Sequence, residues 1–459
     1  MSTEETTSAD AERKKHTISL DRHTSRYRIE FEELAKEFHG KCPVAWNDTH
    51  GGYWFASGNK ELFDIARRAD VLSNDHDVKG IRKGYQGISI PSVVVPGVPR
   101  RRGGFLEMDP PEQRYYRQAL NPYLSPAAVA RWRPVLEEVT RACIDEVIES
   151  GRIDFVDDLA NIVPAVFTLA MLGLPIKDWT VYCEPTHAAV YTSPDDPGYA
   201  RMRELQAVMG QHLMGNVFAV RENPRPGLIN ELLNLEINGE RPDDGEIFGV
   251  IGLIIGGGFD TSTALTAHSL EWLSEHPGER DRLSRERETL LDSATEEFLR
   301  YFTPAQGDGR TISQDCVING TEFKEGERLW LSWAMANRDE KVFEDPHNVH
   351  LDRKGNRHAS FGLGIHRCIG SNVARAVFKI MLTAVLDRMP DFVCDPEGAE
   401  HYDTTGVING MKHLPATFTP GRRLGPGLEE TLERMQRLCD EQGLAEPVTV
   451  RATAAKLDG

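Results

Sequence analysis

The stretch His358-Ala-Ser-Phe361-Gly362-Leu-Gly364-Ile-His366-Arg-Cys368-Ile-Gly370 is a glycine-spaced loop that carries one cysteine. Residues 371–382, which follow it, combine good helix formers with an apolar stripe, so they predict a helix that begins just beyond Cys368. The free N–H groups and the positive dipole end of that helix would favour an anionic sulfur. The glycines permit sharp turns and a close approach to a flat surface. Phe361 offers a ring that could shield one side of a thiolate.

A single cysteine is more often a buried, inert thiol than a ligand, so the spacing carries the argument. The loop resembles the signature of the haem-thiolate cytochrome P-450 family, Phe-x-x-Gly-x-His-x-Cys-x-Gly, and fills every fixed position of it. The resemblance implies that Cys368 is the axial ligand of the iron in haem b, with Phe361 and His366 against the cofactor. It also implies a mainly α fold with a smaller β-rich region, formed as a single triangular domain with the haem buried inside.

The composition excludes several other classes of protein. Among 459 residues, Lys+Arg number 53 and Asp+Glu 71, and the net charge of −18 argues against nucleic-acid binding and against a polybasic membrane patch. Seven cysteines without close pairs indicate reduced thiols rather than a disulfide framework. The acidic N-terminus resembles neither a signal peptide nor a membrane anchor, and the apolar run at 250–259 is too short to span a bilayer. We therefore expect a soluble, cytoplasmic protein.

The chain divides into three parts by pattern. Residues 1–16 have low hydrophobicity and predict a disordered tail. Residues 17–420 form the expected cytochrome P-450 domain, with strands between 42 and 56 and a long irregular stretch at 71–108. Residues 421–459 extend beyond the usual end of the family pattern. They predict an amphipathic helix at 427–439, which could pack on the body, form an oligomer contact or remain loose.

A long helix is predicted from Asp243 to His276, and Gly256-Gly257-Gly258 lies in its middle. Three glycines inside a helix cost about 1 kcal/mol each relative to alanine, so a compensating feature is expected. The absent side chains would let a flat ligand lie against the backbone; a simple kink with a polar neighbour is the other interpretation. Gly-Gly-x-Asp-Thr also resembles the family's oxygen-activation motif. That resemblance places Gly257 against the haem, makes Asp260 and Thr261 catalytic, and predicts a local break in the helix.

Four further positions resemble the family's haem-propionate contacts. Gln113 and Arg117 are four residues apart, so they project from one face of a predicted helix. Arg310 opens a segment that resembles strands, and His366 stands two residues before the cysteine. Each would more often be an ordinary surface or core residue by itself. The resemblance implies that all four bind the cofactor.

Glu297 and Arg300 match the family's Glu-x-x-Arg pair, which implies a buried ion network with a later arginine. Arg338 is the predicted partner, and we interpret all three residues as structural. Four segments are expected to border the substrate pocket, at 88–95, 190–202, 304–308 and 407–411. Their residues are largely apolar and small, which suits a terpenoid, steroid, fatty or aromatic substrate. The sequence does not favour one of these four classes over the others.

The function implied by the resemblance is hydroxylation of a hydrophobic small molecule with O₂. Thr261 would hold a hydrogen-bonded water, and Asp260 would bring protons from solvent. Because the sequence contains no fused flavin or iron–sulfur segment, a separate ferredoxin and ferredoxin reductase are the expected electron donors, docking near Arg114 and Arg367. A peroxide-dependent haem peroxygenase and a non-catalytic haem sensor are the alternatives. The intact Asp260-Thr261 pair argues against the first, and the lack of any signalling segment argues against the second.

Overall fold

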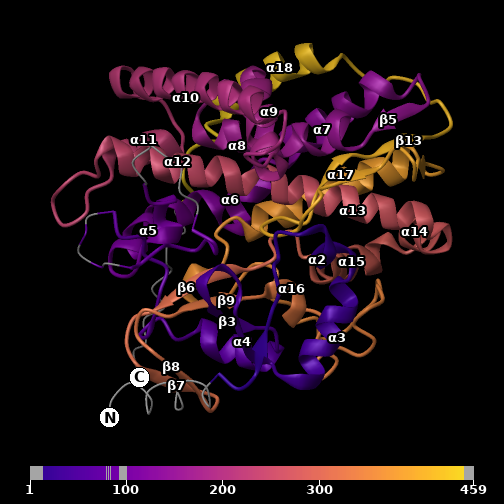
Figure 1. Cartoon of the computed structure of the whole chain (residues 1–459). Coiled ribbons are helices and arrows are strands. Elements are labelled where there is room, and N and C mark those ends of the chain that lie inside the picture. The colour runs from indigo at the N-terminus through magenta and orange to yellow at the C-terminus, as the bar shows by residue number, and fades with distance from the viewer. Residues whose placement is uncertain (1–13, 79, 81, 83, 93–100, 449–459) are drawn as a thin grey trace, which may run out of the picture.

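The computed structural model describes residues 14–78, 80, 82, 84–92 and 101–448. A larger part of packed helices lies against a smaller part that surrounds a mixed β-sheet (Figure 1). The expectation of a mainly α protein with a smaller β-rich region is confirmed. Most of the predicted tail, together with Val93–Val95 of one expected pocket segment, lies outside the described residues.

The main sheet joins the N-terminal region to a segment near residue 320. Its strand order is β1-β2-β3-β9-β6-β4, formed by β1 (Thr17–Ile18), β2 (Val44–Asn47), β3 (Tyr53–Ala56), β4 (Leu72–Ser73), β6 (Asp308–Ile312) and β9 (Arg328–Leu331). The strands predicted between 42 and 56 are confirmed as an antiparallel pair. Gly51 and Gly52 adopt φ of 85° and 90° in the turn, a region that glycine enters without steric cost. Strand β3 then pairs in parallel with β9.

Short helices cover this sheet: α2 (Ser25–Ile29), α3 (Phe31–Lys41), α4 (Asn59–Ala66) and α16 (Trp333–Ala336). The smaller ladders are β10 (Val393–Cys394) with β13 (Pro415–Thr417) and β5 (Arg152–Asp154), β11 (Glu400–His401) with β12 (Met411–His413), and β7 (Cys316–Ile318) with β8 (Thr321–Phe323).

Most of the helical part is formed by helices between residues 112 and 388. They are α5 (Glu112–Leu124), α6 (Pro126–Arg131), α7 (Arg133–Val147), α8 (Ile162–Leu172), α9 (Trp179–Tyr191), α10 (Tyr199–Glu222), α11 (Leu228–Asn234), α14 (Pro277–Arg285), α15 (Arg287–Phe302) and α17 (Ser371–Arg388). Every residue of α8 is buried. All of its residues except Thr168 are apolar, as expected for a helix in the core.

The long central helix is present but divided into α12 (Asp244–Gly258) and α13 (Asp260–Glu275). Asp243 caps its start by accepting a hydrogen bond from the Glu246 N–H, and Pro277 opens the next helix. The combined stretch Asp244–Glu275 is long and apolar enough to cross a membrane, but half of its most apolar window is buried inside the protein. Figure 1 shows α12 and α13 crossing the middle of the molecule, with other helices beside them, as expected for a core helix.

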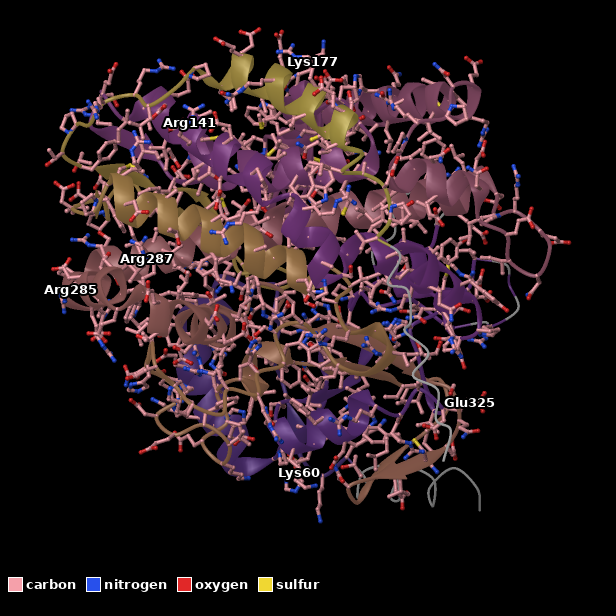
Figure 2. All side chains as sticks on the ribbon, turned by 180° about the vertical axis from the view of Figure 1, so that it is seen from behind. Lys60, Arg141, Lys177, Arg285, Arg287 and Glu325 are labelled. Carbon is pink, nitrogen blue, oxygen red and sulfur yellow. The ribbon has the colours of Figure 1, made fainter. Side chains whose placement is uncertain are left out.

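The C-terminal extension packs on the body of the protein. Helix α18 (Leu428–Gln442) buries Leu432, Met435 and Cys439 in the main hydrophobic core. Arg141 of α7 donates hydrogen bonds to the Pro426 carbonyl and the Thr431 hydroxyl. Figure 2 labels this arginine near the yellow ribbon of the extension. The first of the three alternatives for this segment is therefore the observed one.

Candidate active site

The cysteine loop is held by its own backbone before it enters α17. The N–H of Cys368 donates to the Phe361 carbonyl over 2.8 Å, and α17 begins three residues later, as predicted. Gly364, at φ 68°, is so close to the Ala66 carbonyl that any side chain there would clash. These two contacts help to hold the loop, and with it the sulfur of Cys368, in position.

The charge state of Cys368 is not set by the helix N-terminus alone. Burial raises the pKa of its thiol, while the Gly370 N–H and the nearby Arg367, Arg117 and Arg375 oppose that rise without overcoming it. The expectation that the helix end favours an anionic sulfur is thus only partly met. A bound metal ion would deprotonate the thiol outright.

One cavity connects the cysteine loop to the break in the central helix. It is bordered by Phe361, His366 and Cys368 of the loop and by Gly257, Gly258 and Thr261 of the helix. Most of the remaining wall is apolar: Phe105, Leu106, Leu124, Phe167, Met171, Leu253, Ile254, Leu265, Ile369 and Val373. Residues about 100 positions apart in the sequence therefore share one largely apolar cavity.

The predicted break in the helix lies at Phe259, whose φ and ψ are −90° and −77°. The Thr261 hydroxyl donates to the Gly257 carbonyl over 3.0 Å. A Cβ atom added at Gly256 or Gly257 would meet nothing within 4 Å, so the helix surface there is open. This surface could accept a flat molecule, as the glycines predict.

Cationic and polar groups converge beside the cavity, and Asp308 is the one carboxylate among its described lining residues. His366 and Arg117 border it, and Arg310 is buried close by. The pKa of His366 is lowered to about 3, mainly by burial and further by the positive charges of Arg310 and Arg117. The buried Nδ1 atom of His366 has no hydrogen-bond partner. Carboxylates entering this corner would satisfy all three side chains, so the residues present fit the propionates of a haem.

Gln113 contacts the cysteine loop directly. Its amide donates to the Ile365 carbonyl over 2.8 Å, and it does not border the cavity as described. It therefore ties α5 to the cysteine loop. Its role as a direct propionate ligand stays a prediction.

Asp260 and Thr261 do not face the same space. Asp260 is buried, accepts hydrogen bonds at Oδ1 from His187 and Tyr402, and is absent from the described cavity wall. Thr261 thus borders the cavity while Asp260 points into the protein interior, and the catalytic roles of both residues stay predictions. Successive helical residues point about 100° apart, so the helix separates the two groups. His187 and Tyr402 had no motif that could have identified them.

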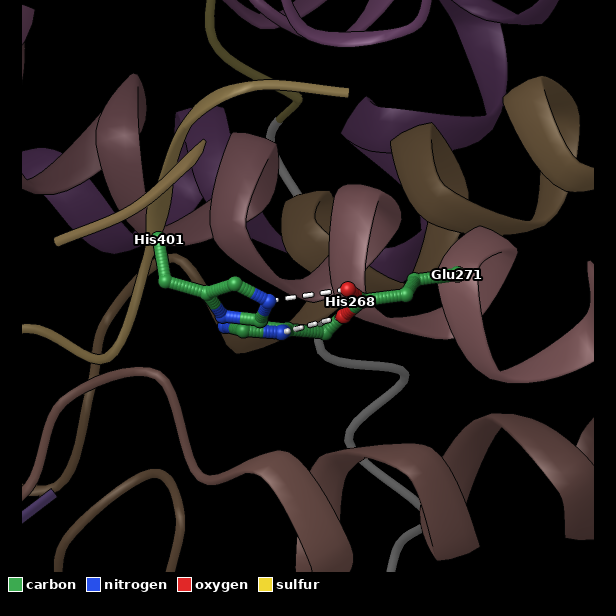
Figure 3. A group of neighbouring side chains, drawn as sticks. All are labelled: His268, Glu271 and His401. Atoms are coloured by element: carbon green, nitrogen blue, oxygen red, sulfur yellow. Dashed lines mark hydrogen bonds and ion pairs between the residues drawn. The ribbon is translucent and has the colours of Figure 1, made fainter. Parts of the chain in front are cut away.

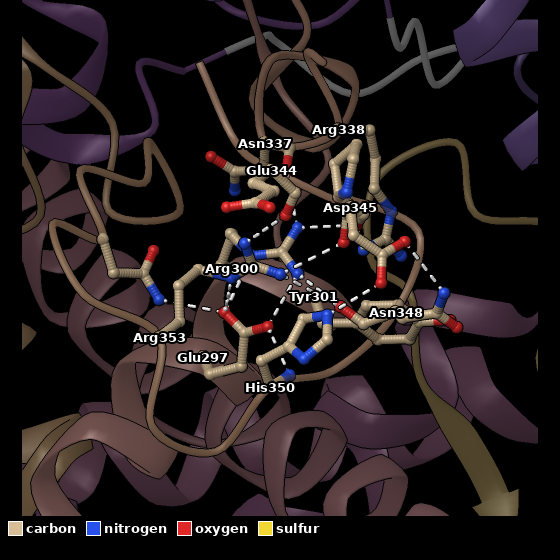
Figure 4. Close-up of polar contacts among 12 residues, drawn as sticks. Glu297, Arg300, Tyr301, Asn337, Arg338, Glu344, Asp345, Asn348, His350 and Arg353 are labelled. Atoms are coloured by element: carbon tan, nitrogen blue, oxygen red, sulfur yellow. Dashed lines mark hydrogen bonds and ion pairs between the residues drawn. The ribbon is translucent and has the colours of Figure 1, made fainter. Parts of the chain in front are cut away.

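The expected ion network is present, but with a different later arginine. Glu297 and Arg300, both fully buried, form a bidentate pair with two contacts of 2.8 Å. Arg353, not Arg338, supplies the later cation, at 2.8 Å from Glu297 Oε2 (Figure 4). Arg338 instead stacks over the Tyr301 ring at 3.7 Å. The prediction of Arg338 is wrong because spacing alone could not show which arginine turns towards the carboxylate.

The expected pocket segments have different outcomes. Pro304, Ala305 and Asp308 border the cavity, whereas the described parts of 88–95, 190–202 and 407–411 do not. Much of the wall comes instead from α8, α12 and the turn Gly104–Glu107. Helices that are apolar on all sides give no pattern that separates a pocket wall from core.

Comparison with known proteins gives consistent matches. Residues 201–407 match the family model described as Cytochrome P450. A Steroid C26-monooxygenase from Mycolicibacterium smegmatis is 31% identical over 333 residues, covering 71% of this chain and 80% of that protein. Linalool 8-monooxygenase from Pseudomonas putida is 28% identical over 387 residues, covering 82% and 93%. The crystal structure of CYP109E1 from Bacillus megaterium with testosterone has a TM-score of 0.73 at 26% identity, covering 86% of this chain and 100% of that one.

Proposed function

Because the chain belongs to the cytochrome P450 family, it is a haem-dependent monooxygenase, and we propose that its substrate is a steroid or terpenoid. The cavity shared by Cys368, Thr261 and an apolar wall is the observation that carries the proposal. Burial of an apolar molecule there would contribute roughly 25 cal/mol per Å² of surface removed from water. Two similar proteins are named for oxidation of a steroid and of linalool, a terpenoid, which favours these two of the four substrate classes.

Haem, when bound, supplies an iron centre that activates O₂, and an axial thiolate favours O–O cleavage by donating electron density. In this proposal Cys368 binds the iron through Sγ, and Phe361 covers one side of the sulfur. Arg117, Arg310 and His366 bind the propionates. The side-chain-free surface at Gly257 leaves room beside the central helix.

The proton path in this proposal uses Thr261 and Asp260 from opposite sides of the helix. Thr261 borders the cavity and holds a water there through its hydroxyl. Asp260 carries protons from the buried contact with His187 and Tyr402, and its free Oδ2 atom has no hydrogen-bond partner. A rotation of Asp260, or a short water chain through the break at Phe259, completes the path.

Electrons are proposed to come from a separate ferredoxin and its reductase. The Gln113–Ile365 hydrogen bond places α5 against the cysteine loop, so the exposed Arg114 and Arg367 lie on neighbouring elements. Two exposed cations near the loop suit an acidic donor despite the net charge of −18. All seven cysteines are free, which fits the reducing cytoplasm where we expect the protein to work.

The haem-loaded protein provides a direct test. Steroids, terpenoids, fatty acids and simple aromatic compounds are titrated while the haem absorption is followed, because a substrate that enters the cavity displaces solvent near the iron. Bound compounds are then incubated with O₂, ferredoxin, reductase and NAD(P)H, and the products are analysed. Hydroxylation of a steroid or terpenoid supports the proposal. If only compounds of another class are hydroxylated, the proposed substrate class is wrong. If peroxide alone supports turnover at the same rate as ferredoxin, reductase and O₂, the result supports the peroxygenase alternative.

A further inference from the structure

Three potential metal ligands meet outside the cavity (Figure 3). His268 and Glu271 lie one turn apart on α13, and His401 reaches them from β11. His401 Nε2 lies 2.8 Å from Glu271 Oε1, and His268 Nδ1 lies 3.6 Å from Glu271 Oε2. The ligand atoms of all three side chains lie within 4.8 Å of one another. Each imidazole thus points one nitrogen at a different oxygen of the same carboxylate.

Metal binding to this set would replace a proton. His401 Nε2 is within hydrogen-bond distance of Glu271 Oε1, so one proton lies between these two atoms. Neutral imidazole and ionised carboxylate are the forms that bind metals, so an ion that binds both groups would displace that proton.

The separation between His268 and Glu271 fits two ligands of one metal ion better than it fits a direct hydrogen bond. The 3.6 Å separation between His268 and Glu271 is too long for a hydrogen bond. Two ligands bound to tetrahedral zinc at about 2.0–2.1 Å lie roughly 3.3 Å from each other. The observed separations of 2.8 and 3.6 Å lie on either side of that value.

We propose that His268, Glu271 and His401 bind one divalent transition-metal ion, for which zinc is the best match to the donors. Two imidazoles and one carboxylate leave a fourth zinc position for water. Phe302 stacks on His268 with a 5.3 Å separation of ring centres, which holds that ring in place. The side chains of Glu271 and His401 are 20% and 29% exposed, which gives an ion a route from solvent.

The ion would join the central helix to the hairpin of β11 and β12. His401 is followed by Tyr402, which donates to Asp260. A metal at His401 would therefore hold the start of the segment that carries Tyr402, one of the partners of Asp260. None of the three ligands borders the cavity, so this site is separate from the haem site.

A second group of similar composition provides a matched control. Asp154, Asp157 and His413 also meet the distance condition, but they lie partly or fully at the surface. Their contacts, 3.1–3.3 Å from His413 Nδ1 to the two carboxylates, are ordinary exposed ion pairs. We assign no site to them.

Zinc binding to the haem-loaded protein tests the proposal, because Cys368 is then occupied. The protein is treated with a chelator, given one equivalent of zinc, desalted and analysed for zinc, and binding is also followed by calorimetry. We expect one zinc per chain. Glu271→Gln and His401→Gln should each weaken binding more than about 100-fold, beyond the 10–100-fold typical of an outer-sphere contact. His413→Gln should leave it unchanged.

The variants separate loss of a ligand from loss of the fold. Glu271→Gln retains the shape of the side chain, and His401 is partly exposed, so both proteins should keep the haem spectrum of the wild type. Zinc should raise the melting temperature of the wild type but not of these two variants. Equal zinc content in the wild type and Glu271→Gln, or loss of the zinc in His413→Gln, would overturn the proposal.

Discussion

The Nδ1 atom of His187 lies 2.6 Å from Oδ1 of Asp260 in the interior of the protein. The hydroxyl of Tyr402 donates to the same oxygen over 2.7 Å. Burial and the charge of Asp260 raise the pKa of Tyr402 far above its ordinary value, so the phenol stays protonated and remains a donor. The contact joins α9, α13 and the segment after β11, and it occupies one oxygen of the proposed proton donor.

Replacement of Asp260 by Asn should slow product formation about 100-fold, the lower end of what a positioned acid or base contributes. Tyr402→Phe removes one donor and leaves the carboxylate, so it should slow the reaction less than about tenfold. The measurement is product formed per unit time with saturating ferredoxin and reductase. A wild-type rate in Asp260→Asn would remove Asp260 from the proton path.

Replacement of Thr261 by Ala should divert electrons from product to peroxide. The hydroxyl borders the cavity and is the group proposed to hold water there. NAD(P)H consumption, peroxide and product are measured together. Thr261→Ser keeps a hydroxyl at this position and should preserve most of the coupling. Unchanged coupling in the alanine variant would exclude this role.

Replacement of Cys368 by Ser should abolish the absorption band of the reduced carbon monoxide complex that gives the family its name. Cys316→Ser is the matched control, because that thiol is partly buried on β7, away from the described cavity wall. It should leave the spectrum intact. Retention of the band in Cys368→Ser would show that another residue binds the iron.

Replacement of Arg353 by Met should destabilise the protein by about 3 kcal/mol, because it removes one partner of a buried carboxylate. Hydrogen bonds and charges from Arg300, His350 and Arg353 outweigh burial and lower the pKa of Glu297 below its usual 4.5. The stabilisation is therefore present above pH 4.5 and is lost as the pH falls through the lowered value. Denaturant unfolding at several pH values should show the difference between wild type and variant shrinking in acid. A constant difference would contradict this assignment.

Replacement of Met435 by Ala should cost about 2–5 kcal/mol of unfolding free energy, the usual range for a buried large-to-small change. Met435 is 5% exposed on α18. Glu430→Ala, on the exposed side of the same helix, should stay within about 0.5 kcal/mol of the wild type. Thermal and urea unfolding provide the comparison. An equal effect of the two changes would show that α18 does not pack as described.

The sequence was sufficient for features that depend on local chemistry. Gly256–Gly258 predicted the open helix surface, the family resemblance of the following motif predicted the break, and the cysteine loop predicted the start of α17. The sequence was insufficient where the partner of a side chain lies far away in the chain and several candidates exist. Arg338 and Arg353 are both candidates by spacing, and only the path of residues 344–353 decides that Arg353 reaches Glu297. Likewise, no periodicity shows that Asp260 turns towards His187.

The main sheet has a consequence for synthesis of the protein on the ribosome. Strands β1 to β4 end at residue 73, but their partners β6 and β9 are complete only at residue 331. At 5–20 residues per second, roughly 10–50 s separate the two events. During that interval β3 has an unpaired edge, which is a known starting point for aggregation. Nascent chains should therefore depend on chaperones most strongly before β9 emerges, although the helices between these strands can already begin to pack.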